Sequence, residues 1–373
     1  MTNQDDLLPE GLEDRLPREA KAADAAMREV LDVMDAHGYD RVSPPLVEFE
    51  KSLSGRMAGG NDGATARRMF RFVDPVSLRM LAVRSDMTPQ IGRIAATGLA
   101  GAARPLRLCY GGEVALIRAD QLDPARQRLQ LGAELIGSDT VAAAAELVAL
   151  AIEALARAGA KGISVDFTLP DLVDTLAQKA MPLAQEDISR VRRELDTKDA
   201  GGLAQVPGGE AYMPLLYATG PFEQAIERLF KIDAGGALAS RIKGLTQIAE
   251  RVAGSARLTL DPTERHGFEY QSWFGFTIYA DGVRGAVGRG GTYAIGGTDE
   301  PATGFSLYID ALVVALDEPP ARDKLFLPLG HDRDVAARLR AIGWRTVEAL
   351  SGGDDGVALG CTHHLQGVDP VPY

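Results

Sequence analysis

Residues 105–137 read PLRLCYGGEVALIRADQLDPARQRLQLGAELIG. Bulky apolar residues recur through 106–114 and 127–136, and the polar run ADQLDP separates them, so the segment predicts two strands joined by a loop. Gln130 and Glu134 lie four positions apart on the second strand. Because the side chains of a strand alternate between two faces, both residues point to the same side. We therefore expect this segment to form one wall of a polar cleft.

The chain on either side of this segment alternates between predicted strands and helices. Further strands are expected at residues 39–47, 70–74, 78–84, 162–169, 256–260, 270–280 and 283–289. Helices are expected at residues 18–37, at 140–159 and in the stretch that ends at 316. A further helix begins near Thr88 and Pro89, with Thr88 as its N-cap, because Thr suits that position and Pro the first helical one. Asp281 and Gly282 predict a hairpin turn, and the glycine run at 288–291 predicts a tight turn because it lacks the ending of a phosphate loop.

The order of these elements predicts an α+β fold with an antiparallel sheet flanked by helices. Helices gathered before and between runs of antiparallel strands argue against a doubly wound sheet. Residues 1–320 are expected to form one core, with a helical insertion at about 170–254 where glycine and proline pairs interrupt the helical stretches. Residues 321–373 alternate strand, helix and strand, which predicts a short C-terminal α/β unit.

Composition restricts the compartment and the partners. The N-terminal run MTNQDDLLPEGLEDRLP is acidic where a secretory signal needs basic and apolar residues, and no window approaches the length of a membrane span. Cys109 and Cys361 are too few for a disulfide framework, so a cytoplasmic protein is expected. The formal net charge of -12 repels nucleic acid at long range. Neither a membrane nor a nucleic acid is therefore an expected partner.

Two other chemistries receive little support from the sequence. Cys361, His363 and His364 fall within four residues, whereas a structural zinc site needs four well-spread ligands, so no metal is expected. The five histidines have no nucleophile elbow near them. A serine or cysteine triad is therefore not expected either.

Several short motifs occur in the order and spacing of one known class of proteins. They are HGYDRVSPPLVEFE, LAVRSDMTPQIGRIAA, LCYGG, QLGAELIG, HGFEYQSWFGFTIYADG, GRGGTYAIGG and ATGFSLYIDAL. Over roughly residues 8–316 the chain resembles the core of class II aminoacyl-tRNA synthetases, and within that class the histidyl-tRNA synthetases. Each motif is weak alone, but their common order makes the resemblance specific. It implies the antiparallel sheet of the class II fold.

Three departures from the synthetase pattern separate this chain from an active enzyme. Leu116 falls where the synthetases carry an arginine that grips ATP, although a two-residue shift would place Arg118 there. Ala311 replaces the arginine of the last motif, and His266 replaces one in the histidine-recognition segment, with Arg265 one residue away. Removing a preorganised donor typically lowers a rate about a hundredfold to a thousandfold. The chain is therefore identified as a member of the ATP phosphoribosyltransferase regulatory subunits, a catalytically silent branch, with no catalytic residue and no cofactor expected.

The resemblance implies that the amino-acid pocket persists and binds free histidine. The implied histidine-binding residues are Asp86, Thr88, Gln130, Glu134, His266, Glu269 and Tyr270. The oxygens of Asp86 and Thr88 suit an ammonium group. Gln130 and Glu134 would form one wall, and the segment that contains Glu269 would form the opposite one.

Each of these residues also has a purely structural interpretation. Gln130 and Glu134 could lie on a strand face exposed to water. Asp86 and Thr88 could do no more than cap the following helix. His266 could be a surface residue or a hydrogen-bonded core residue.

The resemblance implies a regulatory role in histidine biosynthesis. Such a chain would bind a short-form ATP phosphoribosyltransferase catalytic subunit, activate it, and mediate feedback inhibition by free histidine. The family implies a hetero-oligomer built on a dimer of this chain, with the dimer contact near the first helix-strand segment. Two alternatives stay open: an active histidyl-tRNA synthetase-like enzyme that forms an aminoacyl adenylate, and a nucleic-acid-binding module, which the charge of -12 disfavours.

Overall fold

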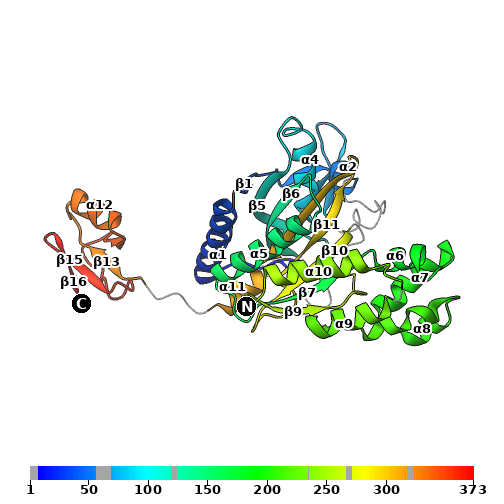
Figure 1. Ribbon diagram of the computed structural model, residues 1–373. Coiled ribbons are helices and arrows are strands. Elements are labelled where there is room, and N and C mark those ends of the chain that lie inside the picture. The colour runs from blue at the N-terminus through cyan, green and yellow to red at the C-terminus, as the bar shows by residue number, and fades with distance from the viewer. Residues whose placement is uncertain (1–6, 56–68, 119–123, 234, 266–270, 317–321) are drawn as a thin grey trace. The chain divides into compact units, whose positions relative to one another are not determined.

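The computed structural model describes residues 7–55, 69–118, 124–233, 235–265, 271–316 and 322–373 (Figure 1). The chain divides into two compact units, Met1–Leu316 and Asp317–Tyr373. Every residue predicted to bind a ligand belongs to the first unit. None of the helices in the described ranges is long and apolar enough to span a membrane.

A nine-stranded sheet of described residues organises the first unit. Its order is β1 (Asp40–Arg41), β5 (Leu106–Ala115), β6 (Gln127–Ile136), β12 (Glu300–Tyr308), β11 (Gly288–Ile295), β10 (Gln271–Tyr279), β7 (Ser164–Thr168), β9 (Arg257–Leu260) and β8 (Gly220–Pro221). Only the pairs β1 with β5 and β7 with β9 are parallel among these neighbours. The predicted strands at 106–114 and 127–136 are confirmed as the antiparallel pair β5 and β6.

The two faces of this sheet differ in polarity. Leu131, Ala133 and Leu135 of β6 belong to the apolar core together with residues of α1 (Pro17–Ala36) and α5 (Val141–Arg157). The two helices pack against each other, as Figure 1 also shows. Because side chains alternate along a strand, Gln130 and Glu134 occupy the opposite face. Helices α1 and α5 therefore cover one face, whereas the face of Gln130 and Glu134 also carries an apolar cluster that includes Ile91, Leu108 and Ile136.

A separate three-stranded sheet precedes α4 (Thr88–Ala96) along the chain. It contains β2 (Val47–Phe49), β4 (Met80–Val83) and β3 (Arg71–Val73), and α2 (Glu50–Ser54) follows β2 directly. The hairpin predicted at 70–84 is confirmed as β3 and β4. The predicted strand at 39–47 is interrupted, because the prolines at 44 and 45 lie between β1 and β2, and those strands belong to different sheets.

Two predictions around the glycine-rich run were wrong. The strand expected at 283–289 begins only at Gly288, because Gly282 and Gly285 both have positive φ and lengthen the connection. The tight turn expected at 288–291 is instead part of β11. Its glycines let neighbouring side chains pack directly against the backbone of β11. A Cβ on Gly288 would meet the Leu307 side chain at 2.6 Å, and one on Gly290 would meet the Phe276 ring at 2.5 Å.

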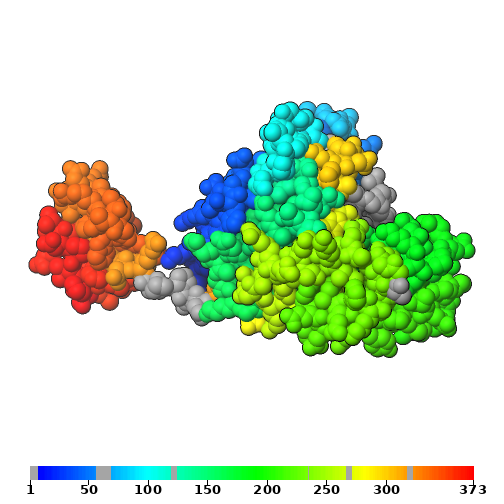
Figure 2. All heavy atoms as spheres, in the orientation of Figure 1, coloured from blue at the N-terminus to red at the C-terminus, as the bar shows by residue number. Residues whose placement is uncertain are grey.

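The chain between β7 and β9 is mostly helical. Its elements are α6 (Leu172–Lys179), α7 (Gln185–Asp196), α8 (Ala200–Ala204), the 3-10 helix η2 (Gly209–Tyr217), α9 (Phe222–Ile232) and α10 (Ala239–Arg251), with the short β8 before α9. Figure 2 shows these residues, coloured green to yellow-green, as one contiguous lobe. Helix α10 contacts α5, so the lobe joins the apolar face of the sheet.

The second unit is a small sheet with one helix. Its strands lie in the order β14 (Arg345–Glu348), β13 (Lys324–Leu327), β15 (His363–Gln366) and β16 (Asp369–Pro372). Leu325 and Leu327 pack against Val335 and Leu339 of α12 (Arg333–Ala341). The sequence did not predict β15 and β16, because β16 contains two prolines, which only an edge strand tolerates.

Candidate ligand-binding cleft

The structure brings four of the predicted residues together on the polar face of the large sheet. The Gln130 Oε1 atom accepts a hydrogen bond from the Met87 N–H at 2.9 Å, and the Gln130 Nε2 atom donates to Asp86 Oδ1 at 2.8 Å. Gln130 is 0% exposed and Glu134 is 1% exposed. The interpretation of these two residues as a water-exposed strand face is therefore wrong. Gln130 instead ties the start of α4 to the sheet.

The N-terminus of α4 differs from the prediction by one residue. Thr88 is its first helical residue, and the preceding Met87 makes no side-chain cap. The Asp86 carboxylate accepts from the Thr88 N–H at 2.9 Å, which is the two-residue reach of an Asx turn. The Thr88 hydroxyl is therefore not needed as a cap, and it lies 3.2 Å from the Tyr110 hydroxyl.

Glu134 accepts hydrogen bonds from two tyrosines that were not among the predicted histidine-binding residues. The Tyr293 hydroxyl donates to Oε2 at 2.7 Å, and the Tyr110 hydroxyl donates to Oε1 at 3.1 Å. The Ser306 Oγ atom lies 3.1 Å from the Tyr110 hydroxyl and accepts from Gln130 Nε2 at 2.8 Å. The four predicted residues and these three therefore form one hydrogen-bonded network.

Strand register explains why these partners converge. Tyr110 of β5 lies opposite Gly132 of β6, and Gly132 lies opposite Ser306 of β12. Directly opposed residues of neighbouring strands share a face, which here is the face of Gln130 and Glu134. The alternation within 105–137 contains the signal for Tyr110, but Ser306 and Tyr293 required the pairing of distant strands.

Burial dominates the acid-base properties of Glu134. Loss of solvation raises its pKa to about 8, and the charge of Asp86 acts in the same direction, whereas the hydrogen bond from Tyr293 lowers it. Burial and the charge of Glu134 also raise the pKa of Tyr110. Glu134 is therefore mostly protonated at neutral pH, and a cation placed beside it would favour the carboxylate.

A row of glycines forms the floor beside Glu134. Gly304 of β12 lies opposite both Glu134 and Gly291 of β11, and Gly291 lies opposite Gly275 of β10. A Cβ on Gly304 would occupy the space of the Glu134 carboxylate, and one on Gly275 would meet the Gln271 Oε1 atom at 2.5 Å. The polar side chains can lie across the sheet because these three positions lack a Cβ.

A cavity lies above this floor. It contains about 300 Å³ of empty space, a volume that includes open solvent at its mouth. The described residues that line it are Thr88, Glu134, Gln271, Arg289, Gly290, Gly291, Tyr293, Gly304, Phe305 and Ser306. The polar side chains in its walls suit a polar ligand.

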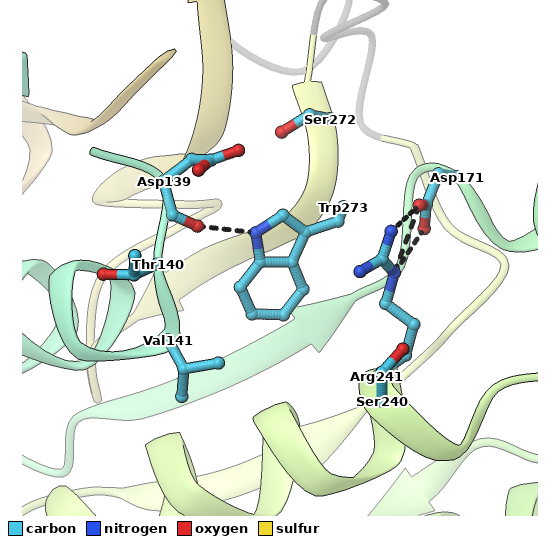
Figure 3. A pocket seen from close by; sticks show the side chains of 8 residues that line it. All are labelled: Asp139, Thr140, Val141, Asp171, Ser240, Arg241, Ser272 and Trp273. Atoms are coloured by element: carbon cyan, nitrogen blue, oxygen red, sulfur yellow. Dashed lines mark hydrogen bonds and ion pairs between the residues drawn. The ribbon is translucent and has the colours of Figure 1, made fainter. Parts of the chain in front are cut away.

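A second hollow has the wrong chemistry for the predicted ligand (Figure 3). Its described lining is Asp139, Thr140, Val141, Asp171, Ser240, Arg241, Ser272 and Trp273. The Arg241 guanidinium is paired with the Asp171 carboxylate, and the Trp273 indole N–H donates to the Asp139 carbonyl at 2.8 Å. Its principal donors already have protein acceptors. Asp86, Thr88, Gln130 and Glu134 do not line it.

The opposite wall of the predicted pocket is not described. His266, Glu269 and Tyr270 lie outside the described residues. Arg265, which precedes them, donates its backbone N–H to the Asp196 carboxylate at 3.0 Å. Gln271, which follows them, lines the cavity. Their role in binding stays a prediction.

Two of the positions that depart from the synthetase pattern, Ala311 and Leu116, follow strands β12 and β5 along the chain. Ala311 belongs to α11 (Asp310–Ala315), directly after Asp310. The Asp310 carboxylate accepts from Arg15 at 2.6 Å, and Arg15 also donates to Glu113 at 2.6 Å. Leu116 follows β5 and donates its N–H to the Arg126 carbonyl at 2.7 Å. The Asp310 carboxylate, next to Ala311, is thus already paired with Arg15.

The nine-stranded sheet and its polar cleft define the class II aminoacyl-tRNA synthetase fold. A solved structure named as an ATP phosphoribosyltransferase regulatory subunit/histidyl-tRNA synthetase from Bacillus halodurans is similar at a TM-score of 0.81 and 25% identity, covering 96% of this chain and 97% of that one. A histidyl-tRNA synthetase from Nostoc sp. PCC 7120 has a TM-score of 0.76 at 16% identity, covering 98% and 91%, and shares the fold. The predicted fold class is confirmed.

The family is shown by sequence. The family model described as Histidyl-tRNA synthetase matches residues 11–312. An ATP phosphoribosyltransferase regulatory subunit from Rhodospirillum centenum is 42% identical over 366 residues, which cover 96% of this chain and 94% of the relative. The chain belongs to the histidyl-tRNA synthetase family and, within it, to the ATP phosphoribosyltransferase regulatory subunits. This is the branch that the motifs and their departures predicted.

Proposed function

We propose that this chain is the non-catalytic regulatory subunit of an ATP phosphoribosyltransferase and that free histidine is its effector. One observation carries the proposal: the cleft keeps a complete network around Gln130 and Glu134, whereas Ala311 stands where the synthetases have an arginine. A frame for an amino acid persists, while a charge that would contact phosphate is missing. The names of the relatives support the same role.

Histidine matches the chemistry of the cleft. Its ammonium and imidazole are donors, and Asp86 and Glu134 supply carboxylate oxygens within one network. A cation beside Glu134 would lower the raised pKa of that group and gain an ion pair in a site shielded from water. Binding of histidine would therefore couple to loss of a proton from Glu134.

The decisive experiment reconstitutes this chain with a short-form catalytic subunit. We expect the mixture to join ATP to phosphoribosyl pyrophosphate much faster than the catalytic subunit alone, and added histidine to inhibit it. Glu134→Gln should preserve activation and lose the inhibition, because it removes the carboxylate and keeps the size of the side chain. Glu153→Gln is the matched control, since Glu153 is exposed and pairs with His37. Equal rates with and without this chain would refute the proposal.

Reciprocity provides a second test of the coupling between histidine and the partner. Coupling between two sites is typically about 1 to 3 kcal/mol and must be the same in both directions. Calorimetric titration of histidine should therefore give different affinities with and without the catalytic subunit. Equal affinities would remove the feedback role even if histidine binds.

Pyrophosphate exchange separates this function from the synthetase alternative. A regulatory subunit should show no histidine-dependent exchange of pyrophosphate into ATP. We expect the same for Ala311→Arg, because Asp310 beside it remains paired with Arg15. Exchange by the unaltered chain would favour the enzyme.

The proposal includes the partners and the compartment. We propose a dimer of this chain within a hetero-oligomer, with its contact near α1 and β1, in the cytoplasm. The described cysteines are free, which is compatible with a reducing compartment. Binding of tRNA that falls steeply with salt would instead support the nucleic-acid-binding alternative.

A further inference from the structure

The charges around the cavity are unevenly distributed. Glu134 lines it directly, and the Asp86 carboxylate joins the same network through Gln130. Among the described lining residues, Arg289 carries the one permanent positive charge. The cleft therefore has an acidic side, formed from β6 and the start of α4, and a cationic position on β11.

Strand register fixes the place of Arg289. It lies opposite Ser306 of β12 on one side and opposite Thr277 of β10 on the other. Directly opposed side chains have Cβ atoms about 5 Å apart and share a face. Ser306 is the residue whose hydroxyl contacts Gln130 and Tyr110. Arg289 thus belongs to the same polar row as the network that holds Glu134.

Two positions without side chains lie between the two charges. Gly291 lies two residues after Arg289 on the same face of β11, and Gly304 lies between Gly291 and Glu134. A ligand over these glycines would meet carboxylates on one side and a guanidinium on the other. An α-amino acid carries the complementary pair of charges, because its ammonium and its carboxylate are bonded to the same carbon atom and both form charge-assisted hydrogen bonds.

We propose that Arg289 binds the carboxylate of the ligand, so that the cleft selects α-amino acids with a free carboxylate over their esters and decarboxylated amines. This inference rests on the proposed function, because it concerns the same cleft and its histidine ligand. It assigns the carboxylate to a residue of β11 that the sequence resemblance did not include among the histidine-binding residues.

Calorimetry with L-histidine and L-histidine methyl ester tests the assignment. The ester keeps the ammonium and the imidazole but has no carboxylate charge. The intact chain should prefer histidine by roughly ten- to a hundredfold, the range expected of a charge-assisted contact. Arg289→Gln should abolish this preference by weakening histidine alone, with the affinity for the ester unchanged. Arg289→Lys should retain part of the preference because it keeps the charge.

Matched variants make the outcomes distinct. Arg257→Gln removes an exposed arginine from β9 of the same sheet and should leave the preference intact. A thermal unfolding scan of each variant checks that it folds. If the preference survives in Arg289→Gln and collapses in His266→Gln, the inference is overturned while histidine binding stands. If neither compound binds the intact chain, the proposed function fails first.

Discussion

Tyr293 of β11 donates its phenolic hydrogen to Glu134 of β6 at 2.7 Å, across the intervening strand β12. The bond lies on the polar face of the sheet, where Tyr110 donates to the other oxygen of the same carboxylate. Three strands are therefore linked through one buried acid. Because both tyrosines act as donors, they favour the ionised form, and burial opposes them.

Glu134→Gln should flatten the pH dependence of stability. The pKa of Glu134 in the folded protein is about 8, above its ordinary value. The stabilisation that its protonated form contributes is therefore fully present at low pH and is lost as pH rises through about 8. Between its ordinary pKa of 4.5 and a pH of about 8, the free energy of unfolding should fall by up to about 1.4 kcal/mol per pH unit because of this group. Urea unfolding of both proteins at several pH values measures the difference.

The comparison between the two proteins isolates Glu134 from other acids. Burial also raises the pKa of Asp166, Asp310 and Glu264, and these groups give slopes of the same sign in both proteins. Only the difference between the slopes belongs to Glu134. Parallel curves for the two proteins between pH 5 and pH 8 would show that folding does not raise the pKa of this carboxyl.

Binding of histidine should release close to one proton at pH 7. Glu134 is mostly protonated before binding, and the ammonium or imidazole of the ligand would favour its carboxylate. Calorimetry in two buffers with different ionisation enthalpies counts the proton. Glu134→Gln should bring the count toward that of the ligand alone, and an unchanged count would place the proton on another group.

Gly304→Ala should destabilise the protein by about 1 to 3 kcal/mol, because its Cβ would overlap the Glu134 carboxylate. Gly101→Ala is the control, since its Cβ would meet nothing within 4 Å, and it should change stability by less than about 0.5 kcal/mol. Adding Glu134→Ala to Gly304→Ala should relieve the clash, so the two effects should not add. Strict additivity would mean that the overlap is not the cause.

Thr140→Ala should cost about 1 kcal/mol of stability. The Thr140 hydroxyl caps α5 by accepting from the Ala143 N–H at 3.3 Å. Thr140→Ser keeps the acceptor and should remain near the parent protein in denaturant unfolding. If the serine variant loses as much stability as the alanine variant, the methyl group rather than the cap is responsible.

The local parts of the fold could be predicted from the sequence. The paired strands at 106–114 and 127–136 follow from alternation over neighbouring residues, and the hairpin at 70–84 follows from its turn. The run at 288–291 could not, because local rules assign glycine to turns. Its glycines make room for Leu307 and Phe276, which only the assembled sheet brings near.

Some residues of the candidate site could likewise be predicted from the sequence, and others could not. Gln130 and Glu134 are visible in one strand, and the resemblance to the synthetases added Asp86 and Thr88. Tyr293 and Arg289 reach the cleft only through the pairing of β11 with β12, which no local pattern specifies. The N-terminus of α4 was displaced by one residue because Asp86, rather than Thr88, accepts the first helical N–H.

Because the floor of the cleft at residues 304, 291 and 275 is glycine, main-chain atoms rather than side chains set the depth of the cleft. A floor without side chains has no rotamers to rearrange, so the spacing of its walls is set before any ligand arrives. A preorganised site of this kind binds with little loss of conformational entropy. The protein could then respond to small changes in effector concentration without refolding its cleft at each binding event.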